Sequence, residues 1–142
     1  MSTPIRITIG PVTMDAALDS SPCAGAIADL LPLHAPLHEW GDEFYFFVPV
    51  ERGPDGTATM EVEAGDIGFW PPGPAVAIFF GPTPLSAGAR PVPASPVNMV
   101  GRVQGDPRVL RTVKGAPEIR IERLEQGGAA PPETPETIYT IQ

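Results

Sequence analysis

Two histidines and a neighbouring glutamate are the first residues whose spacing suggests chemistry. His34 and His38 stand four positions apart, and Glu39 follows directly. On a helix this spacing places both imidazoles on one face, where they could ligate a metal. Pro32 and Pro36 bracket the segment, and proline disrupts the interior of a helix. We therefore interpret both histidines as ordinary loop residues and predict no metal site and no cofactor.

The acidic residues near the aromatic segments do not form an acid–base pair by position. Asp42 and Glu43 are adjacent, so on a strand their side chains face opposite ways. Asp66 follows Gly65, a pattern typical of a turn in which the aspartate bonds its own backbone. We predict no catalytic residue among them.

Candidate nucleophiles are equally weak. Cys23 follows Pro22 in the first turn of an expected helix, where the helix dipole lowers a thiol pKa. No histidine can be placed beside it, so a packing role is the better interpretation. Ser86 and Ser95 lie outside any Gly-x-Ser-x-Gly elbow.

The aromatic side chains carry a stronger signal. Tyr45 and Phe47 share one face of an expected strand, and Phe79 and Phe80 point to opposite faces of another. About half of the aromatic set is expected in the core. The rest can line an apolar pocket beside the proline-rich segment 83–96, a composition typical of small-ligand sites. The residues predicted to line it are Trp40, Tyr45, Phe47, Trp70, Pro72, Phe80, Thr83 and Met99.

Alternating apolar residues and turn signals predict the strands that position this set. Segment 33–39 is expected to be irregular. A hydroxyl or carboxylate cap followed by proline predicts two short helices, at 20–31 and from 106 to about 114. Because no β-α-β alternation is present, the order favours a mainly β antiparallel barrel. The expected strands are 5–9, 12–17, 43–50, 59–63, 67–70, 75–80, 97–103 and 119–124.

Length and composition bound the organisation of the chain. Its 142 residues fit one domain, predicted at 1–126, with a flexible tail rich in Gly, Ala, Pro, Glu and Thr at 127–142. Residues 138–141 are strand-like and are expected either to dock on a neighbouring copy or to stay free. The chain is therefore expected to be a monomer or a homodimer.

Charge and targeting signals exclude several classes of partner. The net charge of −8 repels both nucleic-acid phosphates and anionic membranes. No apolar run approaches the ~20 residues needed to cross a bilayer, and no signal peptide is visible. With a single cysteine there is no intramolecular disulfide, so a cytoplasmic location is expected.

Three stretches resemble a bacterial and archaeal family of small cyclophilin-like proteins of unassigned function. They are residues 40–46, residues 65–73 together with 77–84, and residues 93–102. The middle stretch is the most specific, since Trp-Pro-Pro-Gly is followed closely by Phe-Phe-Gly-Pro-Thr-Pro. The resemblance covers residues 4 to about 124. It implies a closed eight-stranded antiparallel β-barrel with helices capping its ends.

The family is similar to the prolyl isomerases, but this sequence differs from them at the positions of several catalytic and substrate-binding side chains. By this resemblance Phe80 matches the phenylalanine that receives the substrate proline. Ile78, Val97 and Trp70 stand where the isomerases carry glutamine, histidine and alanine. The catalytic arginine is expected in the region 33–50, but no arginine occurs between Arg6 and Arg52. Amide rotation has a barrier of ~18–20 kcal/mol, so we predict at most weak isomerase activity.

These observations predict a non-catalytic binding domain. Its aromatic groove is expected to hold a small apolar molecule or a proline-containing peptide. The alternative is an enzyme, either a weak prolyl isomerase or one of unrecognised type.

Overall fold

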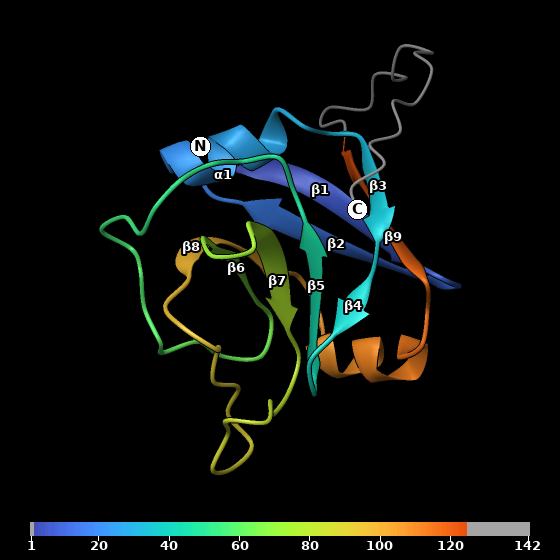
Figure 1. Ribbon diagram of the computed structural model, residues 1–142. Helices are drawn as coiled ribbons and strands as arrows, with labels where there is room; N and C mark the ends of the chain where they lie inside the picture. Colours follow the sequence, from blue (N-terminus) through green and yellow to red (C-terminus); the bar gives the residue numbers. More distant parts are fainter. Residues whose placement is uncertain (1, 125–142) are drawn as a thin grey trace.

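Nine strands in the described part of the chain, residues 2–124, form one antiparallel sheet in this computed structural model (Figure 1). Along the sheet the order is β3-β9-β1-β2-β8-β6-β7-β5-β4. The mainly β antiparallel prediction is therefore confirmed. The strands are β1 (Thr3–Ile9), β2 (Val12–Leu18), β3 (Leu33–Pro36), β4 (His38–Glu39), β5 (Glu43–Phe47), β6 (Asp66–Trp70), β7 (Ala75–Phe79), β8 (Asn98–Val103) and β9 (Glu118–Arg123).

The two ends of the sheet are consecutive in the chain, which closes the barrel. Only Leu37 separates β3 from β4, so one extended segment pairs first with β9 and then with β5. The Leu37 amide bonds the Pro117 carbonyl at 3.0 Å where the segment changes partner. Segment 33–39 is thus not irregular as predicted. Counted as one bent strand, it gives the expected eight-stranded barrel.

Both predicted helix starts are present. In α1 (Pro22–Ala28) the Ser21 hydroxyl accepts a hydrogen bond from the Ala24 amide at 3.1 Å. The second helix is a 3₁₀ helix (Pro107–Val113), capped by Asp106. Each cap supplies an acceptor to amides that have no partner within the helix.

Segment 59–63 corrects another expectation. It forms only a single bridge, in which Thr59 and Val97 exchange backbone hydrogen bonds of 3.0 Å. The rest of the segment has no regular structure, and only Val62 of its apolar residues is buried. The predicted tail at 127–142 lies outside the described residues.

Alternation along the strands divides the buried residues into two groups. Phe44, Phe46, Ile78 and Phe80 point inward and join the barrel core, the large cluster inside the barrel. On the outside of β5, β6 and β7 a second, smaller group forms, named here the outer cluster. It consists of Val62, Ala77, Phe79 and Val97, with Tyr45, Trp70 and Met99 packed against them. None of the described helices is long and apolar enough to cross a membrane.

Candidate functional site

A cavity of about 230 Å³ opens beside the outer cluster, and is named here the aromatic pocket. Its floor comes from strands β5 and β7, where the opposed pairs Glu43–Phe79 and Tyr45–Ala77 share one face. The segment 81–97 covers one side. The lining residues are Trp40, Glu43, Tyr45, Trp70, Ala77, Phe79, Pro93, Ala94 and Val97.

Gly68 allows the covering segment to approach β6. A Cβ built at position 68 would lie 2.8 Å from a Val97 methyl, closer than carbon atoms pack. The absence of a side chain there lets Val97 settle onto the sheet, and the register of β6 against β8 shifts between Ile67 and Gly68. Val97 thereby becomes a wall of the pocket.

Trp70 joins the sheet to the covering segment. Its indole Nε1 donates a 2.7 Å hydrogen bond to the Ser95 hydroxyl, and the ring is half-buried. Indole combines an apolar face with a single donor, so this bond orients the ring as a wall.

The covering segment is ordered by its own polar groups. The Ser86 hydroxyl accepts the Thr83 amide at 2.9 Å and donates to the Arg90 carbonyl at 2.7 Å. The Thr83 hydroxyl donates to the Val92 carbonyl. The Arg90 Nε in turn donates to the Val62 carbonyl at 3.1 Å. The covering segment is therefore an ordered wall of the pocket, and the Arg90 guanidinium is bonded to a backbone carbonyl.

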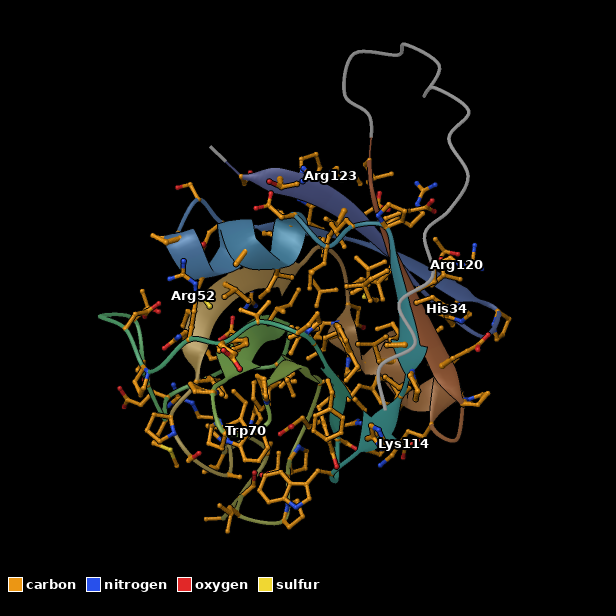
Figure 2. All side chains as sticks on the ribbon, turned by 45° about the horizontal axis from the view of Figure 1, so that its top comes forward. His34, Arg52, Trp70, Lys114, Arg120 and Arg123 are labelled. Atoms are coloured by element: carbon orange, nitrogen blue, oxygen red, sulfur yellow. The ribbon has the colours of Figure 1, made fainter. Side chains whose placement is uncertain are left out.

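No arginine or lysine lines the pocket among the residues that the structure describes. Figure 2 shows Arg52, Lys114, Arg120 and Arg123 well separated from Trp70, and groups separated in one view are separated in space. None of the described residues therefore gives the lining of the pocket a positive charge.

Glu43 is the charged group of the pocket. Its side chain is 8% exposed, and its Oε1 finds no hydrogen-bond partner within residues 2–124. Burial raises the pKa of this carboxyl to about 7, because a low-dielectric surrounding disfavours the charged form. Near neutral pH the group therefore exists in both protonation states.

Asp42, the preceding residue, has the opposite environment. Its carboxylate lies 2.8 Å from Arg111 Nε and 3.0 Å from Lys114 Nζ. Partial burial acts to raise its pKa, but hydrogen bonds from Lys114 and Arg111 outweigh it and hold the pKa below its usual value. The expectation that Asp42 and Glu43 face opposite ways agrees with these contacts.

Three of the predicted site residues, Trp40, Tyr45 and Trp70, line the pocket. Phe47 lies next to it, in ring contact with Tyr45 at 5.8 Å and with His38 at 5.3 Å. The remaining predicted residues do not line it. Thr83 orders the covering segment, Met99 packs against the outer cluster, and Pro72 is exposed.

Phe80, expected in the pocket wall, lies in the barrel core instead. It is fully buried, with its ring centroid 4.6 Å from that of Phe44. Its amide bonds the Asp42 carbonyl at 2.9 Å. Phe79, one residue earlier, points outward and takes the place in the pocket.

Six residues that line the pocket were not predicted as site residues: Glu43, Ala77, Phe79, Pro93, Ala94 and Val97. Glu43 was detectable, because it stands two positions before Tyr45 and so shares its strand face. To predict that Phe79 faces the pocket requires the register of β7 against β5. To predict the same of Val97 requires the path of the covering segment. Neither can be obtained from local spacing.

Cys23 and the histidines have structural partners. The Cys23 thiol is buried, which raises its pKa, and the Asn98 amide lies 3.8 Å from its Sγ. His34 Nε2 lies 2.8 Å from a Glu118 oxygen, and His38 stacks on Tyr45 at 5.2 Å. Within residues 2–124 no three side chains of metal-binding type come together.

Comparisons with known proteins agree on the architecture. The family model described as cyclophilin-like matches residues 3–122. The solution structure of the hypothetical protein AF2241 from Archaeoglobus fulgidus is 33% identical, with a TM-score of 0.72 over 87% of this chain and 95% of that one. McbB in complex with tryptophan is 20% identical, with a TM-score of 0.60 over 92% of this chain and 48% of that one. No curated protein matches the chain significantly.

Proposed function

This chain belongs to the cyclophilin-like family, and we propose that it binds a small, largely apolar ligand in the aromatic pocket. The observation that carries the proposal is the pocket itself. Three half-buried aromatic rings, those of Trp40, Tyr45 and Trp70, surround a cavity whose floor includes Phe79. Rigid rings around a concave apolar surface are typical of small-ligand sites.

The size of the pocket favours a compact ligand over a long peptide. Its volume of about 230 Å³ lies just below the ~300–1,000 Å³ of ordinary ligand pockets. A molecule of one or two rings fits this space. From a proline-containing peptide, the pocket would accept little more than one side chain.

One structural neighbour supports an aromatic ligand. McbB, about half of which this chain matches, was solved in complex with tryptophan, so aromatic molecules are reasonable first candidates to test. At 20% identity the likeness concerns the fold alone, and it assigns no role to any residue of this chain.

A fragment screen by NMR tests the proposal. Small aromatic fragments should shift the amide signals of Tyr45, Ala77 and Phe79. Tyr45→Ala should weaken binding about three- to tenfold, since it removes one stacking wall. Met60→Ala, which trims an exposed apolar side chain away from the pocket, is the matched control. Fragments that shift only residues near His34 and Arg120, which line another hollow, would contradict the proposal.

An enzyme of unrecognised type is the second candidate, favoured by one observation. A buried carboxyl with a pKa of about 7 is suited to proton transfer at neutral pH. The narrower alternative, a prolyl isomerase, has less support, because no arginine in residues 2–124 lines the pocket and Phe80 is in the core. A protease-coupled isomerisation assay should give the background rate. A faster rate that disappears in Tyr45→Ala would reverse this preference.

We also propose a cytoplasmic location and partners other than nucleic acids or membranes. The only cysteine is a free, buried thiol, and the net charge is −8. Light scattering on the protein with and without residues 127–142 would measure its mass in solution and distinguish a monomer from a homodimer.

A further inference from the structure

The polar atoms of the aromatic pocket define the ligand more narrowly. We propose that the ligand is a small amine, a flat apolar group bearing a protonated nitrogen that donates its hydrogen bonds to Glu43. This inference rests on the proposed function, because it names the chemical class that the same pocket would select.

The first support is an unsatisfied acceptor on a residue that lines the cavity. Glu43 lines the pocket, is 8% exposed, and leaves Oε1 without a hydrogen-bond partner in residues 2–124. Buried polar groups in folded proteins nearly always have a partner, and leaving one unpaired is destabilising. A donor on a bound ligand would supply the missing hydrogen bond.

The second support is that neighbouring charged groups are engaged elsewhere. On β4, His38 stacks on Tyr45, and Glu39 accepts the Gly115 amide. Strand β7 carries only apolar residues in the range Ala75–Phe79. The covering segment lines the cavity with Pro93, Ala94 and Val97.

The remaining charges nearby have defined partners as well. Asp42 forms ion pairs with both Arg111 and Lys114 beside the 3₁₀ helix. Arg90 donates to the Val62 carbonyl. Within the described part of the chain, no cation is therefore in place to pair with Glu43.

The third support is the nature of the walls. Trp40, Tyr45 and Trp70 offer aromatic faces, which attract a positive charge through the ring quadrupole. A carboxylate beside aromatic walls therefore favours a cation over a neutral molecule of the same shape. A ligand with its own carboxylate would be repelled by Glu43.

The protonation state of Glu43 provides an independent readout. Burial raises its pKa to about 7, whereas an alkylamine stays protonated well above that pH. Pairing needs the ionised carboxylate, so amine affinity should rise as the pH increases from 5.5 to 8. Affinity for a neutral isostere should change little over the same range.

Three matched probes test the inference by calorimetry: 2-phenylethylamine, 2-phenylethanol and phenylacetate. None absorbs at 295 nm, so Trp40 and Trp70 fluorescence provides a second signal. At pH 8 the amine should bind the wild-type protein at least about tenfold more tightly than the alcohol. Phenylacetate should bind most weakly.

Glu43→Gln is the decisive variant, because it keeps the shape and removes the charge. It should lose the pH dependence and the preference for the amine, so that 2-phenylethylamine and 2-phenylethanol bind the variant within about twofold of each other. Glu61→Gln, which removes an exposed charge outside the pocket, should leave all three affinities unchanged. Thermal unfolding checks that each variant is folded. The pH dependence of amine affinity in the wild-type protein tests the inference even if a variant does not fold.

The possible failures are distinguishable. If the amine and the alcohol bind equally well at pH 8, the amine inference is wrong and the aromatic pocket still binds ligands. If Glu43→Gln retains the full amine preference, Glu43 is not the acceptor and the inference is equally wrong. If none of the probes perturbs the pocket at millimolar concentration, both this inference and the proposed function fail.

Discussion

The two faces of β7 differ in how completely they are filled. On the inner face Phe80, just beyond the strand, packs against Phe44 in the barrel core with ring centroids 4.6 Å apart. On the outer face Phe79 borders a cavity of about 230 Å³ that also contains a carboxylate. Consecutive phenylalanines thus serve different purposes. The inner face supplies stability, and the outer face retains space and polarity suited to recognition.

The pair of acidic residues at the start of β5 repeats this contrast. Asp42 has two cationic partners at the surface, whereas Glu43 is buried with a raised pKa and an unpaired oxygen. An ordinary surface ion pair tolerates exposure, while a buried unpaired carboxylate lowers stability. A role in ligand binding would explain why the destabilising carboxylate of Glu43 lies in the pocket.

Phe80→Ala should have the largest effect. Removing a fully buried ring leaves a cavity in the barrel core, which costs about 3–5 kcal/mol of unfolding free energy. Urea denaturation measures this loss. Phe80→Leu, a milder change, should keep the protein folded with fragment binding unchanged. Weaker fragment binding in Phe80→Leu would place Phe80 functionally in the pocket and remove the contrast between the faces.

Glu43→Gln should raise stability in alkaline solution. The folded-state pKa of about 7 lies above the ordinary value of 4.5, so the unfolded chain releases this proton more readily. Wild-type stability is therefore unaffected below about pH 4.5, falls as the pH rises, and is lowest above about pH 7. The variant should be more stable by up to about 3 kcal/mol at pH 8 and equal to wild type at pH 4.

Denaturant melts of both proteins across this pH range measure the difference. Glu61→Gln serves as the control for loss of one negative charge. A stability gain that is the same at pH 4 and pH 8 would mean that the carboxyl is not desolvated as described.

Trp70→Phe and Ser95→Ala test how the covering segment is held. Each removes the 2.7 Å hydrogen bond between Nε1 and the Ser95 hydroxyl, at a cost of about 0.5–1.5 kcal/mol. Because both remove the same bond, the double variant should lose less than the sum of the single losses. Strict additivity in urea melts would show that the bond does not hold the segment to β6.

Asp42→Asn should have the smallest effect. Its partners Arg111 and Lys114 are substantially exposed, so the loss should stay below about 1 kcal/mol and shrink in high salt. The lowered pKa means that this contribution is present above about pH 4 and disappears as the pH falls through the folded-state pKa. A larger loss, or one insensitive to salt, would indicate a buried pair.

Most of the fold was predictable from local patterns. Alternation identified most of the strands, and cap-plus-proline sequences located the start of both helices. The pattern failed at segment 33–39, where Pro32 and Pro36 suppress the strand signal although the backbone pairs with β9 and then β5. It also failed at 59–63, where alternating residues form only one bridge.

For the candidate site, the sequence by itself determined which aromatic residues are available, and the tertiary structure decided which of them face the pocket. Aromatic content and strand alternation were sufficient to indicate a pocket containing Trp40, Tyr45 and Trp70. Only the assembled barrel decided that Phe79 faces that pocket while Phe80 faces the core, and that Glu43 is desolvated there. The reason is physical: alternation specifies two faces, but which face becomes the interior depends on long-range pairing and on the segment that covers the other side.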